Sequence, residues 1–312
     1  MLGLAVTIPS AATPPDRAHI ATEQRNASSA RLHEQGVAEI VALMNRANRE
    51  AAKAVERAVS SLTGLITAIE PGFLRGGRLI YLGAGTSGRL GVLDASEAPP
   101  TFCVPPDRII GLIAGGDGAL RRSSEGKEDD PQGAISELSA LALGPNDAVL
   151  GIAAGGTTPY VLGALAWAKC LPSPPVTALL SCSPIPPPPG VDQVLIVATG
   201  PEILTGSTRL KAGTATKLVL NAISTTLMVR AGKVYGNLMV DVRATNAKLR
   251  DRAARIISIL TGLDRAGAFV LLDAADGLTK TAVVMQRLGL NKVEAEERLA
   301  VVAGRLDRLL GP

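Results

Sequence analysis

The chain has 312 residues, of which 46% are hydrophobic and 19% charged, and its formal net charge is +4. This length and composition indicate a globular protein with one large domain or two modest ones, and argue against a disordered chain. Only 2% of the residues are aromatic and the arginines are spread along the chain, which argues against stacking platforms for single-stranded nucleic acid or polysaccharide and against a basic nucleic-acid arm.

The beginning of the chain and its cysteines favour a cytoplasmic location. The opening "MLGLAVTIPSAATPPD" lacks a basic stretch and is interrupted by prolines, so it is a poor signal peptide. The three cysteines are odd in number and widely spaced, which fits neither a disulfide framework nor a zinc site. No apolar run reaches the roughly 18 residues of a membrane span. We expect a flexible start over residues 1–26 and neither a nucleic-acid nor a membrane partner.

Helical spacing of apolar residues predicts a helix over residues 27–68. Strand-like runs then alternate with helical patterns, at residues 78–82, 108–114, 147–153, 176–181 and 193–198. Strands joined by helical crossovers predict an α/β fold with a five-stranded, parallel, doubly wound sheet. A ligand of such a sheet binds beyond the carboxyl ends of the strands, where the strand order reverses.

The stretch "GAGTSGRLGVLDASE", residues 83–97, follows the first predicted strand. Its glycines have the spacing of a dinucleotide-binding loop, but the acid that would hold the ribose is missing, since the first candidate is Asp117. Thr86 and Ser87 instead place hydroxyls beside backbone N–H groups at a helix N-terminus, which suits a compact phosphate monoester. The predicted ligand contacts in this loop are Gly85, Thr86, Ser87 and Gly88.

Carboxylates are the expected acid–base groups, because the only histidines, His19 and His33, lie in the N-terminal region. Pro99 and Pro100 predict an early end to the helix after the loop, with Glu97 in its last turn. The C-terminal end of a helix disfavours negative charge, which raises the pKa of a partly buried carboxyl group there. A general acid requires this protonated form. A solvated glutamate at a helix end is the alternative interpretation.

A second acidic segment is "SSEGKEDDPQG", residues 123–133. Asp130 before Pro131 is typical of a helix N-cap followed by proline at the first helical position. Glu125 and Glu128 have no such structural role and share a face if the turn is helical. An exposed acidic turn is the alternative.

The last third of the chain is predicted to be mostly helical. Eight prolines between residues 172 and 189 predict a stiff surface connection, and a long helix is expected over residues 207–231. Ser207 and Thr208 at its start favour an anion, although an ordinary N-cap explains them too. Four further helical patterns, at 248–260, 264–273, 276–287 and 291–310, predict a small C-terminal helical domain, 248–312, after a main domain, 27–247. Asp276 is expected to cap the third pattern.

Three long stretches resemble one known family. "GAGTSGRLGVLDASE" followed by "PPTF", "EILTGSTRLKAGTATKLVLN" and "GKVYGNLMVDVRATNAKLRDRA" are similar to the N-acetylmuramic acid 6-phosphate etherases of the sugar isomerase (SIS) domain superfamily. The similarity runs from "TEQRN" at Thr22 to the C-terminus. It implies cleavage of the D-lactyl ether by elimination and hydration during cell-wall recycling, a homodimer, and no cofactor or metal.

The resemblance also implies roles for individual residues. Glu97 corresponds to the acid–base that protonates the leaving lactate and Glu128 to the second catalytic glutamate, while Glu125 is a lesser candidate for substrate contact. Sugar-phosphate contacts are expected from Gly156, Thr158, Ser207 and Thr208 and from the first glycine-rich loop.

The chain departs from the family pattern in two loops. The family reads "AASGRTPY" where this chain has "AAGGTTPY", so Gly155 replaces a serine and Thr157 an arginine, and "SPIPPPPG" replaces "NPGS". These changes leave the substrate preference open more than the fold. Two related functions also stay open: a non-catalytic sugar-phosphate sensor similar to the glucokinase regulatory protein, and an aldose–ketose isomerase of the same superfamily.

Overall fold

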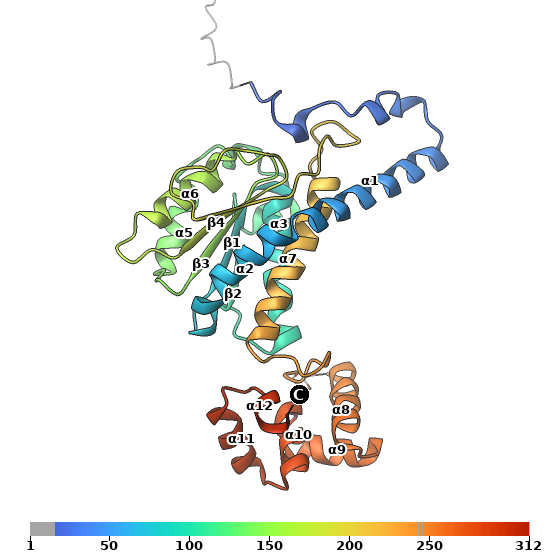
Figure 1. Ribbon diagram of the computed structural model, residues 1–312, viewed down its shortest axis with the longest axis vertical. Coiled ribbons are helices and arrows are strands. Elements are labelled where there is room, and N and C mark those ends of the chain that lie inside the picture. Colours follow the sequence, from blue (N-terminus) through green and yellow to red (C-terminus); the bar gives the residue numbers. More distant parts are fainter. Residues whose placement is uncertain (1–15, 243, 245, 312) are drawn as a thin grey trace, which may run out of the picture.

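A five-stranded parallel sheet forms the centre of the computed structural model, which describes residues 16–242, 244 and 246–311 (Figure 1). The strands are β1 (Leu79–Gly83), β2 (Ile109–Ile113), β3 (Ala148–Ile152), β4 (Val176–Ser181) and β5 (Gln193–Ile196). They lie in the order β2-β1-β3-β4-β5, so the strand order reverses between β1 and β3. The predicted fold class and all five predicted strands are confirmed.

Alternating residues of the strands build two hydrophobic cores. Leu79 and Tyr81 pack with the helices on one face of the sheet, whereas Ile80 and Leu82 pack with those on the other. The first face is covered by α2 (Val59–Leu74), α3 (Gly85–Phe102) and α7 (Lys211–Arg230), the second by α5 (Ile135–Ala140) and α6 (Pro159–Lys169). Short turns complete this part, namely η1 (Ala21–Glu23), η2 (Ala27–Ser29), η3 (Leu32–Glu34), α4 (Gly118–Arg121) and η4 (Glu125–Lys127).

The predicted helix over residues 27–68 is wrong in its bounds. The segment begins with the turns η2 and η3, and α1 (Val37–Arg57) starts only at Val37. Two local bonds explain the delay: the Asn26 side chain accepts from the Ser28 N–H, and the Glu39 carboxylate accepts from the Gly36 N–H at 2.8 Å. Side-chain caps of this kind compete with helix continuation and define the first residue of a helix.

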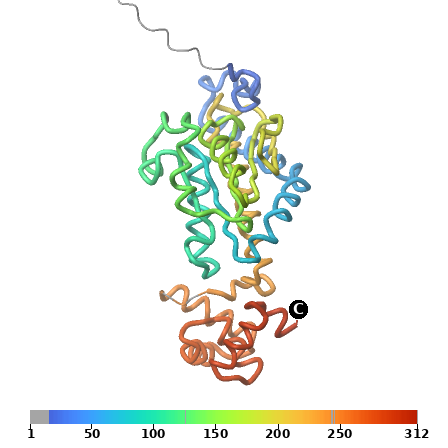
Figure 2. Tube along the Cα trace, turned by 90° about the vertical axis from the view of Figure 1, so that its left-hand side faces the viewer, coloured from blue at the N-terminus to red at the C-terminus, as the bar shows by residue number. Residues whose placement is uncertain are grey.

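Five helices after residue 246 share a hydrophobic core of their own, at the opposite end of the molecule from the N-terminal segment (Figure 2). They are α8 (Ala247–Thr261), α9 (Arg265–Ala274), α10 (Thr279–Leu288), α11 (Lys292–Val301) and α12 (Asp307–Leu310). The fourth predicted helix is divided, because the chain turns through positive φ at Ala303 and Gly304.

Asp276 does not cap α10, contrary to the prediction. The residue before α10 is Leu278, whereas Asp276 adopts φ 51° and pairs with Lys292 at 2.6 Å. In the described part of the chain, no helix is long and apolar enough to cross a membrane.

Glycine allows α3 to begin directly against β1. A Cβ atom on Gly88 would lie 2.5 Å from the carbonyl oxygen of Gly83 and 2.7 Å from Cγ1 of Ile113. Gly85, the first residue of α3, has φ +52°, a conformation that other residues rarely adopt. Gly88 is therefore a packing residue, and this close contact directs the start of α3 to the edge of the sheet.

We predict that Gly88→Ala lowers the free energy of unfolding by about 3 kcal/mol or more, because the added methyl group meets backbone that has no room to yield. The matched control is Gly64→Ala in α2, where a Cβ meets nothing within 4 Å. This control should be unchanged or up to about 1 kcal/mol more stable. Urea unfolding of both variants measures the difference, and equal stabilities would contradict the packing role.

Candidate functional site

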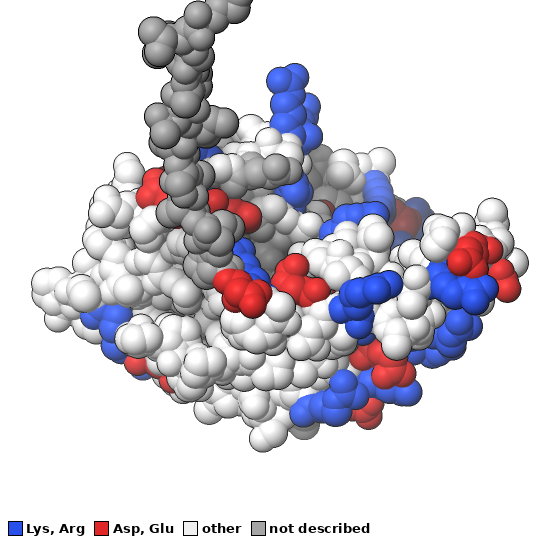
Figure 3. All heavy atoms as spheres, turned by 90° about the horizontal axis from the view of Figure 1, so that it is seen from above, with Lys and Arg blue, Asp and Glu red and all other residues white. Residues whose placement is uncertain are grey.

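A cleft of about 180 Å³ lies at the carboxyl ends of β1 and β3, where the strand order reverses. The loop after β1 contributes Ala84 to Ser87, and the loop after β3 contributes Ala154, Gly155, Thr157 and Thr158. Figure 3 shows this end of the molecule from above, with both acidic and basic side chains beside broad uncharged areas. The cleft lies where an open parallel sheet binds its ligands.

The start of α3 provides an anion-binding arrangement in this cleft. Gly85, Thr86 and Ser87 form the first turn of the helix, whose N–H groups have no acceptor within the helix. Thr86, Ser87 and Thr158, which carry hydroxyl groups, belong to the same cleft lining. Hydroxyl and N–H donors at the positive end of a helix are the donor set that binds a phosphate monoester.

The start of α7 does not provide a second arrangement of this kind. The carboxylate of Glu202, which is fully buried, accepts from the N–H groups of Lys211 and Ala212 at 2.9 Å each. Burial raises the pKa of Glu202, although these two hydrogen bonds oppose the rise. The first N–H groups of α7 therefore already hold a carboxylate.

This arrangement also corrects the predicted start of the long helix at residue 207, since α7 begins at Lys211. Thr208 lines the cleft, whereas Ser207 is not part of its lining. Lys211 is buried, and burial lowers its pKa while Glu202 and Glu50 oppose that effect.

Glu128 lines the cleft beside Gly85. Its backbone carbonyl accepts from the N–H of Tyr160 at 3.0 Å, which ties the acidic segment to the first turn of α6. The same residue also borders a neighbouring cavity of about 50 Å³, together with Arg89. A carboxylate is thus placed next to the helix start that favours an anion.

Glu97 does not lie in the last turn of its helix, contrary to the prediction. Pro99 and Pro100 are inside α3, which continues to Phe102 and ends where Cys103 adopts φ 51°. The two prolines remove N–H donors without ending the helix. The charge of the helix end therefore gives no reason to expect a protonated Glu97. Glu97 is exposed and is not part of the cleft lining of its own chain.

The neighbouring acid Asp94 has a structural role. It is buried, pairs with Lys217 of α7 at 2.8 Å and accepts from the hydroxyl of Tyr81 at 3.2 Å. Burial, and then the negative charge of Asp94, raises the pKa of Tyr81. Asp94 thus holds α3, β1 and α7 together.

The structure brings some predicted site residues together and separates others. Gly85, Thr86, Ser87, Glu128, Thr158 and Thr208 line one cleft. Gly156 has φ +75° and lies against Ile185, so it shapes the loop. The side chain of Glu125 lies outside what the structure describes. Asp130 closes a local turn by accepting from the Gln132 N–H at 2.9 Å, and α5 begins only at Ile135, so the predicted N-cap is wrong.

Sequence reasoning missed the N-terminal segment. Arg17, Ile20 and Glu23 line the cleft, and Ile20 and Thr22 are buried, although residues 1–26 were expected to be flexible. The signal was available in "TEQRN", a stretch of the family resemblance that begins at Thr22. A motif that continues into a segment without secondary-structure pattern indicates that the segment has a role.

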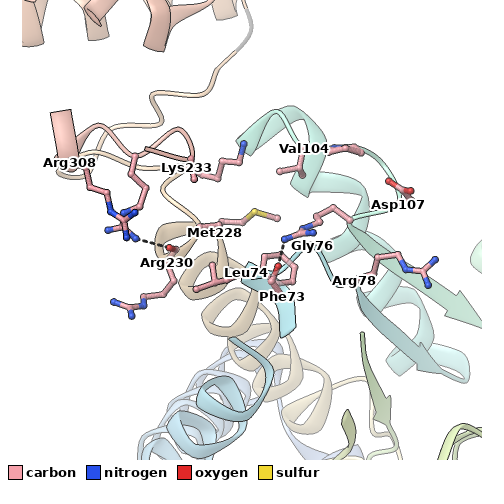
Figure 4. Close-up of a pocket in the computed structure, with 15 residues that line it drawn as sticks. Phe73, Leu74, Gly76, Arg78, Val104, Asp107, Met228, Arg230, Lys233 and Arg308 are labelled. Carbon is pink, nitrogen blue, oxygen red and sulfur yellow. Dashed lines mark hydrogen bonds between the residues drawn. The ribbon is translucent and has the colours of Figure 1, made fainter. Parts of the chain in front are cut away.

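A larger cleft, about 590 Å³, lies at the other end of the sheet (Figure 4). It is rich in basic side chains, but most of them are engaged: Arg78 pairs with Asp147, Arg230 with Glu70 and Lys233 with Asp241. The helices α2 and α7 end at this cleft, so their free carbonyl groups face it and complement cations. A phosphate is better placed at the start of α3.

Comparisons with known proteins identify the relatives of this chain. The family described as the glucokinase regulatory protein N-terminal SIS domain matches residues 61–169. An N-acetylmuramic acid 6-phosphate etherase from Gloeobacter violaceus is 53% identical over 272 residues, 87% of this chain and 88% of the relative. One from Rubrobacter xylanophilus is 49% identical over 298 residues, 94% and 96% of the two chains.

Among solved structures, an E. coli CFT073 protein in complex with A5P aligns with a TM-score of 0.47 at 15% identity, over 65% of this chain and 97% of that one. Within the described residues, no group of three or more histidine, cysteine, aspartate or glutamate side chains is arranged to hold a metal ion.

We predict that the double variant Thr86→Ala/Ser87→Ala binds sugar phosphates at least about 100-fold more weakly, because each hydrogen bond to a charged group contributes about 1.5–3 kcal/mol. Isothermal titration with glucose 6-phosphate measures the affinity. Ser139→Ala, at an exposed position of α5, is the control and should bind as the parent does. Parent-like binding by the double variant would remove these hydroxyls from the site.

Proposed function

Because the chain belongs to the N-acetylmuramic acid 6-phosphate etherase family, we propose that it cleaves the D-lactyl ether of N-acetylmuramic acid 6-phosphate, as a carbon–oxygen lyase of cell-wall recycling. The products are N-acetylglucosamine 6-phosphate and D-lactate. One observation carries the proposal: a helix start suited to a phosphate monoester and the carboxylate Glu128 share a single cleft.

The chemistry needs a base and an acid. In the open-chain sugar, the proton on C2 is acidic because C2 lies next to the aldehyde. When a base takes that proton, the electron pair of the broken C2–H bond forms the C2–C3 double bond. The C3–O bond breaks, its electron pair stays on the lactyl oxygen, and this oxygen takes a proton from an acid. Water then adds to C3, and a proton returns to C2. Two carboxyl groups with separated pKa values are sufficient for these steps.

We assign Glu128 to the C2 proton. The phosphate on C6 fixes one end of the substrate at Gly85 to Ser87, and Glu128, in the segment between β2 and α5, borders the same cleft. A carboxylate held in this way reaches carbon atoms of the sugar while the phosphate stays at the helix start. Positioning by a remote charged group is the general means by which enzymes align a weak base with a carbon acid.

We assign the leaving-group proton to Glu97 of the partner subunit in a homodimer. Glu97 lies more than three turns beyond Gly85, about 18 Å along the axis of α3 at 1.5 Å per residue. That distance is much longer than the few single bonds between phosphorus and C3, so Glu97 of the same chain does not reach the substrate. A second chain is therefore needed to complete the site.

The surface around Glu97 supports such a dimer. Leu93 precedes it by one helical turn on the same face of α3 and is 45% exposed, and Leu218 of the adjacent α7 is 38% exposed. These exposed leucines of the adjacent helices α3 and α7 are apolar side chains that a second chain would cover. A symmetric dimer uses the same patch twice and completes two sites at once.

We also infer a cytoplasmic enzyme with two folded units, residues 27–247 and 248–312. The hydrophobic core that α8 to α12 share supports a second unit, and Val240 and Val242, which precede residue 248, also belong to this core. A non-catalytic sensor is the second candidate, supported by the match to the regulatory protein's SIS domain over residues 61–169. Release of D-lactate by the purified protein separates the two, since a sensor binds the sugar phosphate and releases nothing.

Glu128→Gln should reduce D-lactate release by about 10²- to 10⁴-fold, because the amide cannot take a proton. If Glu128 acts at C2, solvent deuterium should also fail to enter the product at that carbon. Glu297→Gln, on the exposed side of α11, is the control and should behave as the parent. Turnover of Glu128→Gln within about threefold of the parent would exclude the assigned role.

Mixing two inactive variants tests the shared site. Random pairing of Glu97→Gln with Glu128→Gln subunits should restore about a quarter of parent activity, since half of the dimers are mixed and each mixed dimer keeps one complete site. Activity is measured as D-lactate after unfolding and refolding the mixture. If both glutamates of a site belonged to one chain, the mixture would stay inactive.

A further inference from the structure

We propose that Arg17 binds an anionic group of the substrate, in place of the arginine that the family carries at the position of Thr157. The inference rests on the proposed function. Arg17 and Thr157 line the same cleft, although 140 residues separate them in the chain. The N-terminal segment thus supplies a charge that the loop after β3 has lost.

Several contacts hold this segment at the cleft. Ile20 is 4% exposed, and its N–H donates to the carbonyl of Arg17 at 2.9 Å, closing a turn that fixes the backbone of Arg17. The N–H of Thr22, which is fully buried, donates to the Ser183 hydroxyl at 3.3 Å. Farther along, the Asn26 side chain donates to the carbonyl of Pro201 at 3.1 Å. The position of Arg17 therefore depends on tertiary contacts.

The departures from the family pattern pack against one another around the cleft. A Cβ atom on Gly155 would lie 3.4 Å from Cγ2 of Ile20, an ordinary van der Waals distance, so Ile20 lies directly beside the position of the missing serine side chain. Ser183, which holds Thr22, belongs to the proline-rich segment that replaces "NPGS". Ile185 of that segment lies 2.7 Å from where a Cβ on Gly156 would be. Compared with the family pattern, the loop after β3 lacks a serine side chain and an arginine. Ile20 and Ile185 pack against this loop, and Arg17 brings a positive charge to the same cleft.

Charge identifies what Arg17 binds. Among the described residues that line the cleft, Arg17 is the only arginine or lysine, and Glu23 and Glu128 are acidic. The substrate brings a phosphate and the lactyl carboxylate, so without a cation these anions would face only carboxylates and neutral donors. A guanidinium binds either group through two parallel hydrogen bonds, which a lysine does not match. No ion pair among the described residues engages the Arg17 guanidinium.

The test combines loss and relocation of the cation. Arg17→Ala should raise the KM for D-lactate release at least about tenfold with little change in kcat, as expected for a residue that positions the substrate. Arg17→Lys should recover only part of the loss. Adding Thr157→Arg to Arg17→Ala should restore the KM. Arg31→Ala, an exposed arginine paired with Glu34, is the matched control and should match the parent.

Binding of N-acetylglucosamine 6-phosphate, measured by calorimetry, identifies the anion. If Arg17→Ala also weakens this product, Arg17 binds the phosphate; if only the substrate is affected, Arg17 binds the lactyl carboxylate. A parent-like KM together with parent-like product binding would overturn the proposal. If Thr157→Arg fails to lower the raised KM of Arg17→Ala, Arg17 does not take the place of the family's arginine at position 157. Absence of D-lactate from the parent would contradict the proposed function, while product binding by the same variants would still report on Arg17.

Discussion

The contact between Gly83 and Gly88 is the constraint on which the site depends. The carbonyl oxygen of Gly83 occupies the space that a side chain at position 88 would need, so α3 starts as close to β1 as backbone allows. This closeness brings the first N–H groups of a long helix to the sheet edge where the strand order reverses. The hydroxyls of Thr86 and Ser87 and the loop after β3 then surround the same point.

Charge at the helix ends distinguishes this edge from the rest of the molecule. At the start of α7, the buried carboxylate of Glu202 accepts hydrogen bonds from two N–H groups that would otherwise bind an anion. At the opposite end of the sheet, where α2 and α7 finish, most of the basic residues that line the larger cleft are paired with carboxylates or complement helix carbonyls. The start of α3 thus places N–H donors and the residues Thr86 and Ser87 in the cleft, together with Arg17 of the N-terminal segment.

The sequence alone predicts those features of the fold that depend on local patterns of residues. Strands buried on both faces appear as short apolar runs, and the glycines of the first loop indicate a close approach between strand and helix. Contacts that no local pattern predicts decided the rest. The Glu202 carboxylate, nine residues before Lys211, accepts from the first N–H groups of α7 across a loop without regular structure. Burial of Ile20 and Thr22 depends on Gly155 and Ser183, which are distant in the chain. Two consecutive prolines usually indicate the end of a helix, but α3 continues through Pro99 and Pro100, so Glu97 lies before its last turn.

The most direct test of the account is a crystal structure of the protein with N-acetylglucosamine 6-phosphate. We predict that the phosphate lies on the N–H groups of Gly85 to Ser87, with C2 and C3 of the sugar facing Glu128 of the same chain and Glu97 of the partner subunit. A phosphate bound instead in the basic cleft beside Phe73, Arg108 and Arg308 would contradict the account, because the start of α3 would then not be the phosphate site.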